Sequence, residues 1–505
     1  KTTHHRMEIA LSILLLAGLL LSGCNLPQGS DVSFRSPQRQ TEIAGILNPE
    51  GLPTASEPDQ TETMAAPVAE GYLRYTTQHG DTLDALGLRF GVPTGAIQFD
   101  EPGPTEGLLR PGQTLLIPDV LEEIITLSGP LLPDSAVTYG PTVGDFDAAE
   151  VARLAGGFLA GYSERVKSET LTGPEILATV ALETSTNPRL LLAFLEYRSG
   201  WVFGSPDGAA QDPYPLGFGA GADTGLYKEL MIAAKLLAQG FYGWRDGSRL
   251  EVTFADGTLG RLDPQTVNAG SAALMQLFGV LYDPAEFRAE LYDPGRFLGF
   301  YEEMFGEPWS RAARVEPYLL ADTRQPELSL PFAPGEAWSL TGGPHITWQT
   351  GTPWGAIDFA PVTGEAHCAV STRWATAAAS GLVVRSDRGV VAIDLDGDGD
   401  EGTGWVLIYL HMAAEDRTQV GDRLAQDAPV GRPSCEGGSA SGTHLHLTRK
   451  FNGEWLGVGE PLPLVLGGWQ AVAGAARYQG SLVRGDEVIT ASPSGSAGSL
   501  IYRED

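Results

Sequence analysis

Apolar residues follow two different spacings along this chain, and the change between them divides it. Between residues 144 and 325 the apolar positions recur at helical spacing, with Gly, Pro or Asn at the breaks. The predicted helices are Ala148–Val166, Gly173–Leu182, Pro188–Tyr197, Gly225–Gln239 and Asn268–Phe278. Beyond residue 330, short apolar runs bounded by Gly-, Ser- and Asp-rich turns are typical of strands. The clearest of these runs are Ala356–Ala360, Val390–Leu395, Trp405–His411 and Thr443–Thr448.

This pattern predicts a multidomain α+β protein. We expect a mainly helical domain at 140–325, an antiparallel all-β domain at 330–470 and a C-terminal β extension at 471–505. The length of 505 residues with 42% hydrophobic content agrees, since it exceeds what a single domain usually holds.

Residues 1–23 have the pattern of a bacterial lipoprotein signal peptide. The apolar run Ile9–Leu21 follows two histidines and an arginine and leads through a lipobox-like Leu-Ser-Gly to Cys24. Because the run is short for a membrane span, we expect it to be removed and Cys24 to be lipidated. Residues 24–70, rich in Pro, Ser, Thr, Gln and Glu, are a predicted flexible linker. The protein is therefore expected to be exported and lipid-anchored in the cell envelope, facing the cell wall.

Residues 72–120 resemble a LysM module at both ends. The first end is Tyr75-Thr-Thr-Gln-His-Gly-Asp-Thr-Leu83, and the second is Leu109-Arg-Pro-Gly-Gln-Thr-Leu-Leu-Ile-Pro118. The resemblance implies a β-α-α-β unit, with its first helix around Leu83 to Phe90, that binds glycans containing N-acetylglucosamine. Phe99-Asp100 stands near the place of the usual asparagine, so a purely structural module is the alternative.

The charge balance disfavours two kinds of partner, nucleic acids and anionic membrane surfaces. A net charge of −30 at pH 7 disfavours nucleic acid and electrostatic adhesion to an anionic membrane. Membrane attachment would then depend on the lipid at Cys24.

Five of the eight histidines lie in the predicted all-β domain. Four of them and one aspartate are candidates for a common site: His345, Asp358, His411, His444 and His446. Two residues apart on a strand, His444 and His446 point to the same face and can serve one site. A catalytic zinc usually takes three protein ligands and keeps a fourth position for water. Five such residues therefore suffice for three ligands and two acid/base groups.

These residues resemble the LytM or lysostaphin-type zinc endopeptidases, which cut the peptides of peptidoglycan. Most members carry their first histidine four residues before the aspartate, where this chain has Trp354. The β-lytic branch instead places that histidine after a Gly-Gly-x motif, with a longer loop before the aspartate. His345 follows Gly342-Gly343-Pro344 and precedes Asp358 in that manner.

The resemblance covers about 335–470 and implies a role for each residue. His345, Asp358 and His446 would bind one Zn²⁺, and His411 and His444 would be the uncoordinated catalytic histidines. The implied substrate is peptidoglycan, cleaved in its stem or cross-bridge peptides. The alternative is a non-catalytic peptidoglycan-binding lipoprotein that acts as a scaffold or regulates another wall hydrolase.

Two cysteines remain once Cys24 is assigned to the lipid. In an exported protein, Cys368 and Cys435 are a candidate disulfide across the catalytic domain. Closing so long a loop would contribute about 4 kcal/mol in the chain-entropy model. Two unpaired buried thiols are the alternative. Zinc binding by these cysteines is disfavoured, because neither has a Cys or His at zinc-finger spacing.

Three other features are weaker candidates for a catalytic or metal-binding role. Glu196 ends an apolar helix that vaguely resembles the acid-bearing helix of lysozyme-like muramidases, but a structural glutamate is favoured. Residues 394–401 alternate Asp like the start of an EF-hand but lack its closing glutamate, since Trp405 holds the twelfth position. This segment is predicted first as a hairpin loop, with a Ca²⁺ site as the alternative. His367 fits no ligand position.

Overall fold

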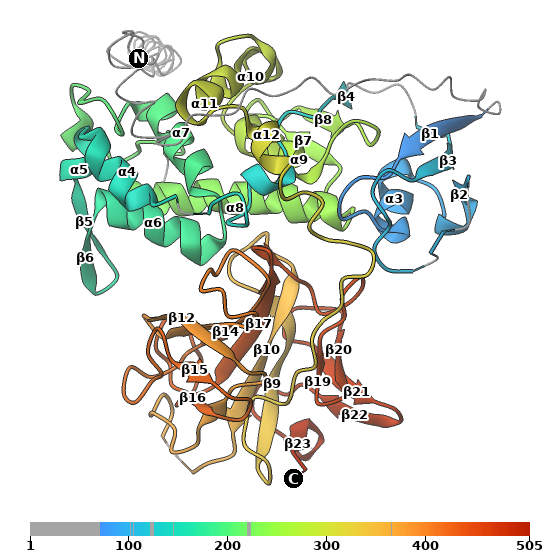
Figure 1. The fold of residues 1–505 in the computed structure, drawn as a ribbon, viewed down its shortest axis with the longest axis vertical. Helices are drawn as coiled ribbons and strands as arrows, with labels where there is room; N and C mark the ends of the chain where they lie inside the picture. The colour runs from blue at the N-terminus through green and yellow to red at the C-terminus, as the bar shows by residue number, and fades with distance from the viewer. Residues whose placement is uncertain are drawn as a thin grey trace, which may run out of the picture.

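The computed structural model describes residues 71–504 except 101–102, 105, 122–125, 145, 220–223 and 365. The predicted signal peptide, Cys24 and the linker lie outside the described residues. Helices gather at one end of the molecule and strands at the other, with a small N-terminal unit beside the helices (Figure 1). The predicted mixture of helices and mainly antiparallel sheets is therefore confirmed. Within the described part of the chain, no helix is long and apolar enough to cross a membrane.

The N-terminal unit is a small sheet with one helix. Strand β1 (Tyr72–Thr76) pairs antiparallel with β3 (Thr114–Pro118), which also pairs with β2 (Gln98–Phe99). Helix α3 (Leu83–Phe90) has the predicted bounds. In place of the second predicted α-helix there is a single 3₁₀ turn at Thr94–Ala96.

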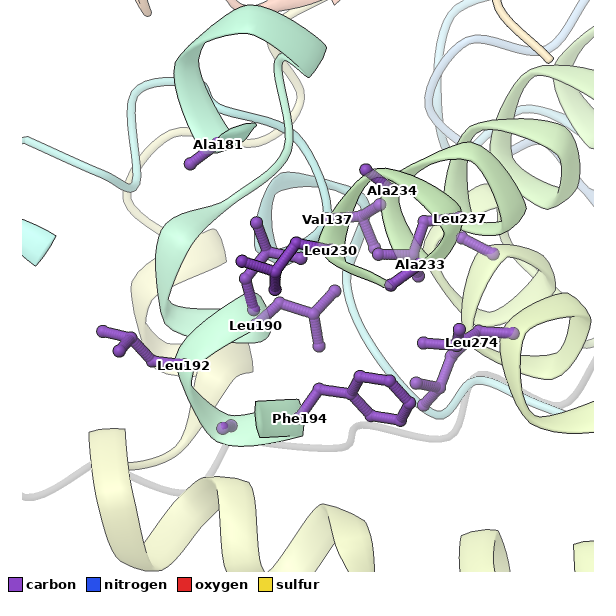
Figure 2. Close-up of a cluster of buried hydrophobic side chains, with 14 of the residues drawn as sticks. Val137, Ala181, Leu190, Leu192, Phe194, Leu230, Ala233, Ala234, Leu237 and Leu274 are labelled. Carbon is purple, nitrogen blue, oxygen red and sulfur yellow. The ribbon is translucent and has the colours of Figure 1, made fainter. Parts of the chain in front are cut away.

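The middle of the chain is helical, and a large cluster of buried apolar side chains forms its core (Figure 2). Its α-helices are α4 (Ala148–Ala155), α5 (Phe158–Gly161), α6 (Gly173–Thr184), α7 (Pro188–Ser199), α8 (Leu226–Arg245), α9 (Ala269–Gly279), α10 (Pro284–Tyr292), α11 (Phe297–Phe305) and α12 (Pro308–Ala312). Strands β4 (Thr126–Leu127), β7 (Glu251–Thr253) and β8 (Leu259–Leu262) form a small sheet. The predicted helices that correspond to α6, α7, α8 and α9 are confirmed within a few residues, except that α8 runs further.

The single helix predicted over Ala148–Val166 is wrong beyond its first half. Gly156, at φ 68°, ends α4 in the left-handed conformation. The next residue lies so close to a neighbouring backbone that a Cβ on Gly157 would stand 2.4 Å from the carbonyl oxygen of Val202. The chain then forms the hairpin of β5 (Ser163–Val166) and β6 (Glu169–Thr172), which projects from the helices toward the large sheet (Figure 1).

A nine-stranded sheet forms the C-terminal part. Its strands are β9 (Ala337–Ile346), β10 (Trp354–Pro361), β12 (Gly381–Asp387), β13 (Val390–Asp394), β14 (Trp405–Leu410), β15 (Arg423–Leu424), β17 (Leu445–Phe451), β18 (Glu454–Trp455) and β23 (Leu500–Tyr502). The order is β15-β12-β13-β14-β17-β10-β9-β23, and β18 pairs with β17. The last strand of the predicted C-terminal extension thus returns to the edge of the main sheet.

Two smaller sheets complete this part of the chain. Strands β11 (Ala375–Thr376) and β16 (Pro429–Gly431) form a pair. Strands β19 (Val465–Leu466), β20 (Trp469–Ala473), β21 (Gly480–Arg484) and β22 (Glu487–Thr490) form an antiparallel sheet.

The two faces of the large sheet belong to different cores. On one face Val391, Leu407 and Tyr409 pack within the β part of the chain. On the other, Val406 and Ile408 join the core of the helical unit. Because successive strand residues point to opposite faces, the helical unit covers one face of the sheet and shares its apolar interior.

Polar contacts reinforce this junction. The guanidinium of Arg245, at the end of α8, lies 2.7 Å from a carboxylate oxygen of Glu454 and 2.9 Å from one of Asp134. The backbone N–H of Trp455 donates to the hydroxyl of Tyr242 on α8, and its indole N–H donates to the carbonyl of Thr184 on α6. These buried bonds fix the helical unit on the sheet.

A buried ion triad lies on the covered face of the sheet. Arg385 on β12 donates two bonds of 2.8 Å to Glu401, and Lys450 on β17 donates one of 2.6 Å. Burial alone would raise the pKa of Glu401, but the two cations lower it overall. The acidic loop between β13 and β14 thus supplies the carboxylate that is bonded to both buried cations.

Glu401→Gln is expected to lower the free energy of unfolding by about 3–5 kcal/mol, because it removes the carboxylate that pairs with both buried cations. Urea denaturation followed by tryptophan fluorescence measures the loss. The control is Glu487→Gln, which breaks an exposed ion pair with Arg484 of 2.9 Å and should cost less than about 1 kcal/mol. Equal effects of the two variants would contradict this account of the triad.

Candidate metal centre

Three adjacent strands of the large sheet, β9, β10 and β17, bring the candidate ligands together. Asp358 on β10 is the register partner of His446 on β17, so both project from the same face. His345, near the end of β9, lies opposite Ala356 of β10. Residues 101 positions apart in sequence therefore meet through ordinary antiparallel pairing.

The three side chains converge on one small space. Oδ1 of Asp358 lies 3.3 Å from Nδ1 of His446 and 3.4 Å from Nε2 of His345. The two imidazole nitrogens are 3.0 Å apart. All three residues are buried.

Backbone carbonyls select the tautomers of both imidazoles. Nδ1 of His345 is 2.9 Å from the carbonyl oxygen of Gly343, and Nε2 of His446 is 3.0 Å from that of Thr347. A carbonyl only accepts, so these nitrogens carry the hydrogen and the opposite nitrogens present lone pairs. This is the support that metal-binding histidines usually have.

The three atoms that face one another in this site all carry lone pairs, and none of them donates a hydrogen bond to another. Two lone pairs face each other, and Oδ1 of Asp358 is buried with no hydrogen-bond partner. Such an arrangement is unfavourable unless a cation lies among the three atoms. Two imidazole nitrogens and one carboxylate oxygen form a donor set that zinc prefers, so the residues fit a zinc ion.

The charge states suit the same ion. Burial lowers the pKa of His345 to about 4, which keeps this imidazole neutral near pH 7. Burial alone would raise the pKa of Asp358, but the neighbouring His446, His345 and His444 lower it overall. The site thus offers a neutral nitrogen from His345 and a negative oxygen from Asp358.

His411 and His444 form a second pair beside this cluster. Their ring centroids are 4.4 Å apart, and Nε2 of His444 lies 3.8 Å from Oδ1 of Asp358. Each Nδ1 donates to a backbone carbonyl, of Glu436 at 2.8 Å for His411 and of Gly442 at 2.7 Å for His444. Burial lowers the pKa of His411 to about 4. Both rings therefore direct Nε2 away from these backbone contacts, with its lone pair available.

The glycine pair before His345 has a steric cause. A Cβ on Gly342 would stand 2.2 Å from Oδ2 of Asp358. Only glycine leaves room for the carboxylate there, and the carbonyl of Gly343 then orients His345. The Gly-Gly-x motif is therefore part of the site itself.

The predicted disulfide between Cys368 and Cys435 is confirmed, with Cα atoms 5.2 Å apart. It adjoins Glu436, whose carbonyl orients His411. The covalent link thus holds the loop that supports one member of the histidine pair.

One residue of the site gave no signal in the sequence. The ring of Tyr478 stacks on His345 with centroids 4.2 Å apart, and its backbone N–H donates to the carbonyl of Pro344. Tyr478 lies in the extension where no chemistry was predicted. Only the folding of β20 and β21 against β9 brings it to the metal centre.

The remaining candidate residues either stabilise the fold or lie outside the ligand cluster. The carboxylate of Glu196 accepts bonds from the backbone N–H groups of Val202 and Phe203 and so holds the turn after α7, which agrees with the favoured structural interpretation. His367 is exposed. Trp354 begins β10 opposite Ile346 and is not part of the ligand cluster.

The acidic loop between β13 and β14 forms the predicted hairpin connection. Carboxylate oxygens of Asp394, Asp396 and Asp398 lie within 4.8 Å of one another. However, both oxygens of Asp394 already accept backbone N–H groups of its own loop, which is a sufficient role for that residue. Nothing else in the loop supports the alternative of calcium.

Known proteins resemble this chain in its helical unit and beyond. Residues 130–318 match the family model described as LasA, N-terminal domain. Over 296 residues the chain is 29% identical to Protease LasA of Pseudomonas aeruginosa strain UCBPP-PA14, covering 54% of this chain and 64% of that protein. Over that stretch, this chain is similar to Protease LasA. The match to the same protease of strain PAO1 has the same extent. The chain spans slightly less than two thirds of these relatives.

Solved structures of peptidases are similar to smaller parts of the chain. The M23 metalloprotease pseudoalterin is 23% identical with a TM-score of 0.28, covering 33% of this chain and 96% of that one. The catalytic domain of lysostaphin from Staphylococcus simulans is 20% identical with a TM-score of 0.17, covering 23% and 80%.

Gly342→Ala is expected to weaken zinc binding about tenfold or more, because the new methyl group would displace the carboxylate of Asp358. Competition with a chromophoric chelator measures the affinity. The matched control is Gly364→Ala, where a Cβ meets no atom within 4 Å. Unchanged affinity in the Gly342 variant would contradict the steric role of this glycine.

Proposed function

We propose that this chain is a lipid-anchored zinc metalloendopeptidase that hydrolyses peptide bonds in peptidoglycan. The observation that carries the proposal is the convergence of two imidazole lone pairs and an unpartnered carboxylate oxygen in one buried space. In this proposal His345, Asp358 and His446 bind one Zn²⁺, and His411 and His444 are catalytic. The relationship to Protease LasA supports peptide hydrolysis.

A zinc ion bound here would lower the pKa of water toward about 7 and polarise the scissile carbonyl. The protein would hold the three ligands rigidly. Asp358 and His446 lie on paired strands, and the carbonyls of Gly343 and Thr347 fix the ring orientations of the two histidines. A site on such a rigid frame needs little reorganisation during the reaction.

The second histidine pair supplies the proton transfers. Nε2 of His411 or His444 can take a proton from the attacking water and return it to the departing amine. The other imidazole, when it is also protonated at Nε2, can stabilise the negative oxygen that develops on the carbonyl. The distance of 3.8 Å from His444 to Asp358 supports placing this chemistry next to the metal.

Substrate and location follow from the sequence resemblances. The LytM-like motifs imply peptidoglycan peptides, and the LysM-like unit at 72–120 would bind the glycan. The helical domain at 140–325 and the peptidase domain at 330–470 would then act at the cell wall, with a lipid on Cys24 as anchor. The β extension at 471–505 would support the metal centre through Tyr478.

Two histidine variants separate metal binding from proton transfer. His446→Ala should lose a ligand, so both bound zinc and the solubilisation of purified peptidoglycan should fall about 100-fold or more. His444→Ala should keep stoichiometric zinc and still lose about 10²–10⁴-fold in rate. Metal analysis and turbidity loss, measured on the same samples, give both values.

The control is His367→Ala, an exposed histidine outside both groups, which should keep zinc and activity. Zinc retained in the His446 variant would refute the ligand set. A wild-type protein that binds peptidoglycan without zinc or hydrolysis would instead favour a non-catalytic scaffold.

A further inference from the structure

His411 has a backbone conformation that its surroundings must hold in place. It follows β14 directly and lies at φ 69°, in the left-handed region that residues with a side chain rarely adopt. Such a residue keeps this conformation where neighbouring contacts determine it. Because His411 is one of the two proposed proton-transfer groups, the contacts that hold its backbone also set the position of its imidazole.

Ser434 supplies two of these contacts. Its backbone N–H donates to the carbonyl oxygen of His411 at 2.7 Å, and its hydroxyl donates to the same oxygen at 3.0 Å. Ser434 is only 2% exposed, so water does not compete for these bonds. Two donors on one carbonyl thus fix the backbone of His411 at the point where the strand ends.

The same hydroxyl supports the imidazole of His411. Its oxygen accepts the backbone N–H of Glu436 at 3.1 Å, and the carbonyl of Glu436 accepts the Nδ1–H of His411 at 2.8 Å. Three hydrogen bonds therefore form a closed circuit, from the carbonyl of His411 through the hydroxyl of Ser434 and the backbone of Glu436 to the imidazole. One hydroxyl holds both the backbone and the ring of this histidine.

The backbone of Ser434 also connects the two histidines of the pair. The backbone N–H of His444 lies 3.5 Å from the carbonyl oxygen of Ser434, and these two residues form an antiparallel bridge. The N–H of Ser434 thus bonds to His411 and its carbonyl to His444. A single buried residue therefore links the two rings, whose centroids are 4.4 Å apart.

The segment around Ser434 has further support of its own. Cys435 is linked to Cys368 by the disulfide, and the carboxylate of Glu436 accepts a backbone N–H of the neighbouring loop at 2.9 Å. Neither contact uses the hydroxyl of Ser434, whose described bonds go to His411 and Glu436. A variant that lacks only this hydroxyl should therefore keep the course of the segment and lose the circuit.

We propose that Ser434 is a positioning residue of the reaction, because its hydroxyl holds the imidazole of His411 as the Nδ1–H tautomer and leaves the lone pair of Nε2 free for proton transfer. The proposal rests on the proposed peptidase function and deepens it. A group that transfers protons must present the correct nitrogen at the correct place, and a small displacement lowers the rate strongly. Ser434 would act only through His411.

Ser434→Ala in the intact chain, with zinc added, tests this role by NMR. The nitrogen-15 shifts of labelled histidine distinguish the Nδ1–H from the Nε2–H tautomer, and the signals of His411 are identified by their loss in His411→Ala. The wild type should hold His411 as the Nδ1–H tautomer. In Ser434→Ala part of the His411 population should shift to the Nε2–H form, because the carbonyl of Glu436 is no longer held.

The kinetic consequence should be a loss of rate without a loss of substrate binding. At saturating peptidoglycan, Ser434→Ala should solubilise the substrate about tenfold more slowly than the wild type. The peptidoglycan concentration that gives half of the maximal rate should stay unchanged, because Ser434 is buried. Bound zinc should also stay unchanged, since the three proposed ligands are intact.

Two further variants separate positioning from stability. Ser434→Thr keeps a hydroxyl and should restore most of the rate and of the Nδ1–H tautomer. Ser329→Ala is the matched control, since Ser329 is also buried in the β part and its hydroxyl donates to the backbone carbonyl of Ala378 at 3.2 Å. It should lower the midpoint of urea denaturation about as much as Ser434→Ala, and it should leave the rate and the His411 tautomer unchanged.

An unchanged His411 tautomer or an unchanged maximal rate in Ser434→Ala would overturn the proposal. Equal losses of rate in Ser434→Ala and Ser329→Ala, or no recovery in Ser434→Thr, would do so as well. Failure of the peptidase function itself would be visible separately, as no solubilisation by the wild type. In that case the tautomer measurement decides: a shift confined to Ser434→Ala would support the positioning of His411, and the absence of a shift would overturn it.

Discussion

The structure depends on one electrostatic constraint, the confinement of two imidazole lone pairs and a carboxylate oxygen within about 3.0–3.4 Å of one another. Inside a protein such atoms repel unless a cation or protons lie among them. The backbone carbonyls of Gly343 and Thr347 already occupy the ring hydrogens, which leaves a cation as the natural solution. Strand register, the glycine pair and the stacked Tyr478 all hold this arrangement in place.

The face of the sheet that carries the candidate ligands also packs against the helical unit. His446 alternates along β17 with Leu445 and Leu447, which point into the β core, so it shares its face with Thr448 and Lys450. Further along that face, Val406 and Ile408 pack into the helical unit. The metal centre therefore lies at the border of a large interface, and the helical unit borders the space that a substrate would enter. Glu401 offsets the cost of burying the charges of Arg385 and Lys450 at this interface, because it pairs with both.

The sequence was most informative where local spacing controls geometry. The two-residue spacing predicts that His444 and His446 lie together. Although His444 immediately precedes β17, both lie within 3.8 Å of Oδ1 of Asp358. Four of the predicted helices have strong apolar spacing. It was least informative where tertiary contacts decide. The break at Gly157 depends on the distant backbone of Val202, and Tyr478 reaches His345 only through the fold of the last strands.

X-ray absorption at the zinc edge tests the central claim most directly, because it reports the atoms bound to the metal. The zinc-loaded chain should show two imidazoles at about 2.0–2.1 Å and oxygen ligands at similar distance, with no sulfur. His345→Ala should remove one imidazole contribution from that spectrum. A sulfur contribution near about 2.3 Å, or an unchanged imidazole count in this variant, would contradict the ligand set and the function built on it.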